Sequence, residues 1–171
     1  MNLQSLEIMS AAVMLGLATI GSGIGMSIVG SAAVGAWKRC YKANKPAPMT
    51  ILALCGMPVS QTFYGFILMQ QMLSVAVAGN NSGLLLGIGF AVGFTMMFTA
   101  IAQGQISAAA CDAVGETGKG FANYLAAIGI AESIALFAMV FSMLAMGMVG
   151  ALEAAPAAAE IISETVPLIA N

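Results

Sequence analysis

One carboxylate lies deep inside an apolar stretch of the sequence, where it could bind a cation or a proton. Glu132 is the only charged residue between positions 120 and 152. An ionisable residue at the centre of a membrane costs about 2.5–3.5 kcal/mol on insertion scales. No lysine or arginine occurs at that depth in any apolar stretch, so an ion pair within the chain is excluded. Glu132 is therefore neutralised either by protonation or by a bound cation. A protonated Glu132 that only holds helices together is the purely structural alternative.

Neutral oxygen groups recur at helical spacing in two other apolar stretches. Met57, Ser60, Gln61 and Tyr64 fall at i, i+3, i+4 and i+7, which puts them on one helix face. Gln103 lies in the third stretch, and a buried amide must find partners. A proton site needs only a carboxyl group and one acceptor, whereas several neutral oxygens beside one carboxylate suit a dehydrated hard cation. Because one negative charge neutralises a monovalent ion, Na⁺ fits best.

Three hydroxyl residues share the helix face of Gln103. They are Thr95, Thr99 and Ser107. Hydroxyl groups in membrane helices commonly bond to the carbonyl one turn back in the same helix. We expect all three to do so rather than to bind an ion.

Pro58 lies beside the polar face of the second apolar stretch. Proline cannot donate to the carbonyl of Leu54, so a kink is expected here. Kinked membrane helices can expose carbonyls that coordinate ions. A kink without any ligand role remains an equal alternative.

The elements that position these residues are predicted from composition. The chain is 60% hydrophobic and 7% charged, whereas a soluble domain carries about 25% charged residues. About 20 apolar residues in a helix cross a bilayer, and open sheet edges are not tolerated there. The sequence therefore predicts an all-α membrane protein of four transmembrane helices, at about 7–37, 48–78, 83–112 and 120–152.

The helices form two tandem hairpins that look related. We predict a first hairpin at 1–78 that has no carboxylate at the position equivalent to Glu132, a second at 79–152 with Glu132, and a weakly ordered or interfacial tail at 153–171. The turn between the hairpins reads GNNSG at 79–83. Aligning Tyr64 with Phe137 places Val59 opposite Glu132.

The basic residues predict the orientation in the membrane. All five lie in the loops at 38–47 and 113–119: Lys38, Arg39, Lys42, Lys45 and Lys119. By the positive-inside rule both loops are cytoplasmic, and the termini and the tail face outward.

Several function classes are excluded or disfavoured by the residue types. The chain has no histidine, and Cys40, Cys55 and Cys111 lack the spacing of a metal site or disulfide framework. The segment GETGKG at 115–120 resembles a phosphate loop superficially, but Gly120 replaces its Ser/Thr and Ala113 its first glycine. The chain itself should not hydrolyse ATP.

Small residues spaced four apart predict close helix packing. They lie on the first and third helices, at Gly21 and Gly25, Gly89 and Gly93, and Ala100 and Gly104. Ordinary bundle packing explains them, and so would a tight inner layer formed by these two helices.

Three segments together resemble the proteolipid rotor-ring subunit (c or K) of V-type and A-type rotary ATPases, and in particular its sodium-translocating members. They are PVSQTFYG at 58–65, IAQG at 101–104 and IAE at 130–132. The resemblance covers about residues 8–152.

The resemblance implies which residues bind the ion. The family's ligands map to Glu132, Gln103, Gln61, Ser60 and the backbone carbonyl of Met57. The kink alone pointed to the Leu54 carbonyl instead. The position of Ser60 often holds threonine in sodium-translocating members.

Supporting roles are implied in the same way. Tyr64 would hydrogen-bond Glu132 and keep the ion-bound state closed. Pro58 would shape the second helix. The pair Glu132-Ser133 is similar to sodium-type F-ATPase c subunits, so Ser133 is a secondary candidate.

The resemblance also implies an assembly and its partners. Copies of the chain would form a closed ring, with the first and third helices inside, in the cytoplasmic membrane of a prokaryote. A stator subunit with an essential arginine and a central stalk on the cytoplasmic loops would be the partners, and no nucleic acid is expected. An H⁺-coupled ring is the near alternative, and a small multidrug-type antiporter with an intramembrane Glu is the distant one.

Overall fold

The chain is helical throughout most of the residues that the structure describes. The computed structural model describes residues 3–78 and 82–169, with side chains placed for 4–77, 83–149 and 151. The helices are α1 (Leu3–Lys42), α2 (Thr50–Gly56), the short 3₁₀ helix η1 (Met57–Val59), α3 (Ser60–Ala78), α4 (Ser82–Thr117) and α5 (Phe121–Ile169). Within the described residues, four stretches are long and apolar enough to cross a membrane, with bounds close to the predicted ones. The predicted fold, a multi-pass helical membrane protein, is confirmed, and the closed ring stays a prediction.

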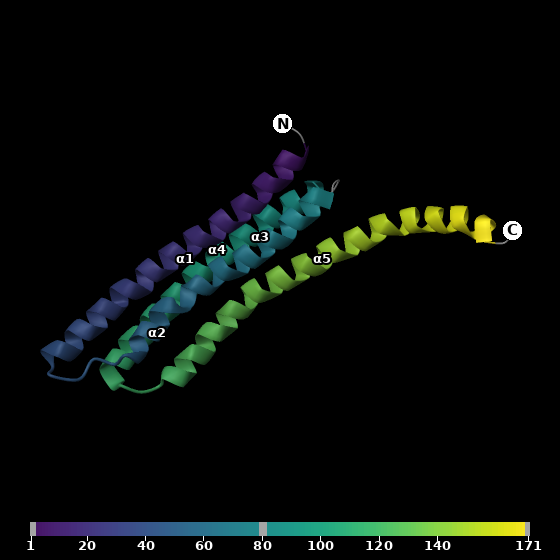
Figure 1. Cartoon of the computed structure of the whole chain (residues 1–171). Helices are drawn as coiled ribbons and strands as arrows, with labels where there is room; N and C mark the ends of the chain where they lie inside the picture. The colour runs from purple at the N-terminus through teal and green to yellow at the C-terminus, as the bar shows by residue number, and fades with distance from the viewer. Residues whose placement is uncertain (1–2, 79–81, 170–171) are drawn as a thin grey trace.

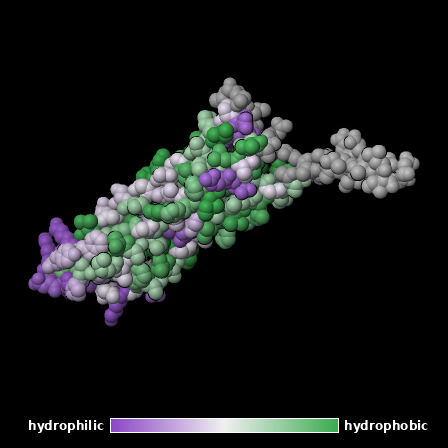
Figure 2. Space-filling view, viewed as in Figure 1, coloured by the Kyte–Doolittle hydropathy of each residue, from purple (hydrophilic) through white to green (hydrophobic). Residues whose placement is uncertain are grey.

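The helices run up and down as two hairpins (Figure 1). The loop between α1 and α2 and the loop between α4 and α5 lie at the same end of the bundle. We call this the basic end, because it carries Lys38, Arg39, Lys42, Lys45 and Lys119. In the space-filling view it is the hydrophilic end of a largely apolar surface (Figure 2).

α1 and α4 are in backbone contact at their glycines. A Cβ atom added at Gly104 would lie 2.4 Å from the Gly25 carbonyl oxygen, and one added at Gly25 would lie 2.4 Å from the Ala100 carbonyl oxygen. Gly21 and Gly89 also face the backbone of the partner helix, at Met97 and Ser10. The predicted close packing at these small residues is confirmed. An inner layer of a ring stays a prediction.

The predicted interruption at Pro58 is present as a turn of 3₁₀ helix between α2 and α3. The N–H of Met57 donates to the carbonyl of Leu54, so the proline does not leave that carbonyl free. A carbonyl oxygen has two lone pairs, so this hydrogen bond does not decide whether Leu54 binds an ion, and its ligand role stays a prediction. The Met57 carbonyl, at the start of the 3₁₀ turn, accepts a hydrogen bond from the Ser60 N–H.

α5 packs less closely than the other helices and leans away from them towards its C-terminal end (Figure 1). Its outward side is apolar and exposed at Ile130, Ile134, Phe137 and Phe141. The spanning part ends at Val149, close to the predicted 152, but the helix itself continues to Ile169. Regular helix therefore extends beyond the predicted end of the fourth helix at 152. An interfacial, outward-facing position of this segment stays a prediction.

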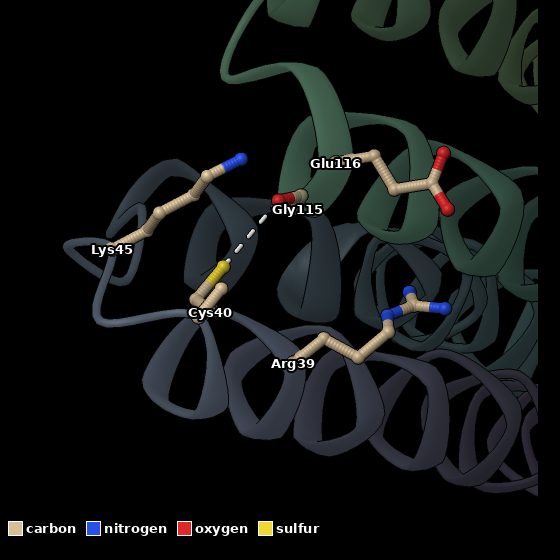
Figure 3. A pocket seen from close by; sticks show the side chains of 6 residues that line it. Arg39, Cys40, Lys45, Gly115 and Glu116 are labelled. Atoms are coloured by element: carbon tan, nitrogen blue, oxygen red, sulfur yellow. Dashed lines mark hydrogen bonds between the residues drawn. The ribbon is translucent and has the colours of Figure 1, made fainter.

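The basic end is tied together by contacts between α1, the following loop and α4. Arg39 forms an exposed ion pair with Asp112 of α4. The Cys40 thiol donates to the Gly115 carbonyl at 3.4 Å, beside a pocket of about 190 Å³ that Lys45 and Glu116 also line (Figure 3). These contacts fix where α4 ends relative to α1.

Candidate functional site

The two hairpins meet at a hydrogen bond between Tyr64 and Glu132. The Tyr64 hydroxyl of α3 donates to Oε1 of Glu132 on α5, with 2.5 Å between the oxygens. Ala135, one turn further along α5, is completely buried and belongs to the same hydrophobic cluster as Met72 and Met96. The carboxylate is thus anchored to the bundle by the residue that the resemblance implied. A role of Tyr64 in keeping an ion-bound state closed stays a prediction.

A group of neutral oxygens lies one turn away on the same face of the second membrane helix. The Ser60 hydroxyl is 3.0 Å from the Met57 carbonyl oxygen and 3.2 Å from Oε1 of Gln61. Gln61 is completely buried, and its amide nitrogen has no partner among the described residues. Three of the predicted ligand residues therefore form one cluster at the break around Pro58.

Among the described residues, Gln103 is the buried side chain with two polar atoms that lack a hydrogen-bond partner. Its side chain is completely buried in α4, and neither its amide oxygen nor its amide nitrogen has a hydrogen-bond partner among the described residues. A buried polar group left without a partner costs about 1–3 kcal/mol. Such a group calls for a partner outside the chain, and an amide oxygen is a good ligand for a hard cation.

The register between α4 and α5 brings Gln103 and Glu132 to a similar depth. Ile106 and Ala110 of α4 line a small apolar pocket together with Tyr124 and Ala127 of α5. The two helices run antiparallel. From this pocket, Gln103 lies about one turn towards the N-terminus of α4, and Glu132 lies one to two turns towards the C-terminus of α5, so both lie on the same side of the pocket. Hydrogen bonds join Glu132 to Tyr64 and Ser60 to Gln61. None among the described residues joins Gln103 to either pair, so the predicted shell is assembled only in part.

The hydroxyl residues divide into two kinds. Thr95 and Thr99 donate to their own helix, to the carbonyls of Ala91 and Thr95, as predicted. Ser133 likewise donates to the carbonyl of Ile130 in α5, so its hydroxyl is directed along its own helix. Ser107 differs from the prediction, because its hydroxyl is completely buried and has no partner among the described residues.

One interhelical contact beside the site was not predicted. The Thr62 hydroxyl donates to the Ser22 hydroxyl of α1 at 2.8 Å. Both residues carry ordinary small polar side chains, and no spacing within either helix indicates the pair. Only the register between α1 and α3 brings them together.

Removing the Tyr64 hydroxyl should expose Glu132 to reagents. In a Tyr64→Phe ring we expect carbodiimide labelling of Glu132 to proceed about 10- to 100-fold faster, because a hydrogen bond to a carboxylate contributes about 1.5–3 kcal/mol. The rate can be followed by mass spectrometry of the labelled subunit. Tyr124→Phe, near the basic end of α5, is the matched control and should label at the wild-type rate. Equal rates in all three proteins would contradict the role of Tyr64.

The second hairpin matches a known family. Residues 86–145 match the family model of the ATP synthase c subunit, a stretch that includes both Gln103 and Glu132. No curated protein sequence matches the chain. This stretch is 60 of the 171 residues, and the match supports its similarity to a non-catalytic, ion-translocating membrane subunit of a rotor ring. The V-type or A-type assignment, the Na⁺ specificity and the ligand set stay predictions.

Proposed function

We propose that this chain is the ion-carrying subunit of the rotor ring of a V-type or A-type rotary ATPase, and that it carries Na⁺. The observation that supports Na⁺ is the completely buried Gln103, whose two amide atoms have no partner among the described residues. A proton on Glu132 would need no such amide oxygen. A sodium ion would use it together with the oxygens of Ser60, Gln61 and Met57, whose cluster lies around the helix break.

The charge of the site agrees with a monovalent cargo. No group of three or more acidic, histidine or cysteine side chains that could hold a metal ion occurs among the described residues. One carboxylate and several neutral oxygens give a neutral complex with Na⁺ and leave a divalent ion with one uncompensated charge. A neutral complex can pass the lipid-facing part of a rotation at low cost, because a net charge inside the bilayer is expensive.

Different residues and partner proteins act at different steps of the proposed transport cycle. Glu132 accepts the Tyr64 hydrogen bond, which joins α5 to α3, and this contact would keep the site closed while Na⁺ is bound. At the stator, an arginine of the partner protein would compete with the ion for the carboxylate and release it. ATP hydrolysis in a separate soluble motor would turn the ring through a stalk docked at the basic end.

Sodium protection of Glu132 against dicyclohexylcarbodiimide tests this proposal. The reagent modifies a protonated carboxyl group, so we expect millimolar NaCl to slow labelling of the purified ring at a pH where labelling is otherwise complete. KCl at the same concentration controls for ionic strength. A Glu132→Gln ring identifies the labelled site, because Glu7 is also buried in the bundle.

The outcomes separate the alternatives. Labelling that NaCl leaves unchanged would contradict Na⁺ coupling and point to an H⁺-coupled ring. Electron microscopy of the same sample in detergent should show a closed ring. Dimers with substrate-dependent antiport would instead contradict the rotor-ring function itself.

A further inference from the structure

α1 supplies none of the proposed ligands, yet it touches both of the helices that supply the neutral ones. We propose that the hydrogen bond between Ser22 and Thr62 is a positioning contact that sets the size of the cation site and thereby its preference for Na⁺ over Li⁺. The inference rests on the proposed function and deepens it, because it concerns the same site.

The contact lies directly beside two ligand residues. Thr62 follows Gln61 in the first turn of α3, and its hydroxyl donates to Ser22 Oγ at 2.8 Å. The accepting residue, Ser22, is 3% exposed, and the donor Thr62 is partly buried. The bond bridges α1 to the start of α3. It therefore fixes the height and rotation of the segment that carries Ser60 and Gln61.

α1 also contacts the other side of the site within the same turn. Gly25, three residues after Ser22, lies against the Ala100 carbonyl of α4 and the Pro58 side chain at the helix break. Gly104, the neighbour of Gln103, lies against the backbone of Gly25. These backbone contacts leave no room for a Cβ atom, so α1 and α4 pack at their closest approach at this point.

The consequence is a fixed separation between the two ligand-bearing segments. Gln103 is set by the glycine contact with α1, and Gln61 is set by the Thr62 hydrogen bond to the same helix. Pro58 interrupts the regular helix between Gln61 and the basic end, which removes one source of rigidity there. Discrimination between hard cations depends on cavity size, ligand number and flexibility. A site held at one width favours the ion whose radius matches it.

The test uses purified rings and the carbodiimide assay with two ions. Thr62→Val keeps the shape of the side chain and removes the hydroxyl. We expect the NaCl concentration for half protection of Glu132 to rise about two- to tenfold, which is what one hydrogen bond contributes. The LiCl concentration should change less, so the Na⁺/Li⁺ preference falls. A purely structural role would weaken protection by both ions equally.

Three further variants complete the design. Thr19→Val is the matched control, because Thr19 lies nearby on α1 and its hydroxyl bonds to the carbonyl of Leu15 in its own helix. Its protection curves should equal those of the wild type. Thr62→Ser restores the hydroxyl and should restore the Na⁺ preference. Ser22→Ala combined with Thr62→Val should be no worse than either alone, because both remove the same contact.

The failure of this inference is distinguishable from failure of the proposed function. If the wild-type ring is protected by NaCl and Thr62→Val leaves the Na⁺/Li⁺ preference unchanged, the positioning role is wrong and Na⁺ coupling stands. If NaCl gives the wild-type ring no protection, Na⁺ coupling and the selectivity role are both overturned.

Discussion

Replacing Glu132 with glutamine should abolish ion transport by the assembled complex while leaving the ring intact. Glutamine preserves the shape of the side chain and can still accept the hydrogen bond of Tyr64, so the packing of α5 against α3 has no reason to fail. It cannot release a proton or balance the charge of a cation. Transport should therefore fall to the background, measured as ²²Na⁺ uptake or as acidification in vesicles that contain the whole ATPase.

The matched control is Glu7→Gln. Glu7 is a second buried carboxylate, 1% exposed, and it lies on α1 near the end of the bundle opposite the basic end. The same chemical change there should leave transport in place. Persistent transport in the Glu132→Gln complex would sink the proposed function, because a purely structural membrane protein tolerates that substitution. Loss of the ring in detergent would show instead that Glu132 is needed for assembly.

A single methyl group at Gly104 should destabilise the protein markedly. A Cβ at this position would lie 2.4–2.7 Å from the carbonyl oxygen, Cα and carbonyl carbon of Gly25, and backbone cannot rotate out of the way as a side chain can. Overpacking of a tight interior costs about 1–3 kcal/mol. At a helix position with free space the same change from glycine to alanine would stabilise by about 0.5–1 kcal/mol.

Thermal unfolding of purified Gly104→Ala in detergent measures this effect. The midpoint should fall clearly below that of the wild type. Gly23→Ala is the control, because a Cβ added at Gly23 would meet no atom of the described residues within 4 Å, apart from its chain neighbours and the nearby backbone of its own helix. Its midpoint should be unchanged or higher. An unchanged midpoint for Gly104→Ala would mean that α1 and α4 are not in backbone contact there.

Much of the fold follows from the sequence because lipid is a demanding solvent. Long charge-free stretches have to be helices, and four of them with short polar turns give the two hairpins that the structure shows. Proline has no N–H to donate, so the break at Pro58 could be predicted to within a turn. The end of α5 could not, since prolines and acids at 153–167 resemble a tail whereas helix continues to Ile169.

The candidate site, like the fold, could be predicted only in part from the sequence. Residue type and spacing indicate Glu132, Gln61 and Gln103, because a carboxylate or an amide in an apolar helix has few uses. Contacts between helices are a different matter. That Tyr64 reaches Glu132 came from a resemblance, and the pairing of Thr62 with α1 had no signal at all, since it depends on the register of α1 against α3.

Ser107 is a case in which a hydrogen bond predicted from the sequence is not formed. Its spacing predicted a hydroxyl bonded to its own helix, and the structure leaves that hydroxyl without a partner among the described residues. A serine in a membrane helix has several staggered rotamers, and the neighbouring helices decide which of them is adopted. The sequence of one helix carries no information about that choice.

The first hairpin carries Val59 in the 3₁₀ turn η1, at the position where the second carries Glu132 when Tyr64 is aligned with Phe137. In the proposed ring, a full revolution would then deliver one ion for every four helices rather than one for every two. If the motor hydrolyses a fixed number of ATP molecules per revolution, the ratio of ions transported to ATP hydrolysed is lower. Each ion can then be pushed against a correspondingly steeper electrochemical gradient.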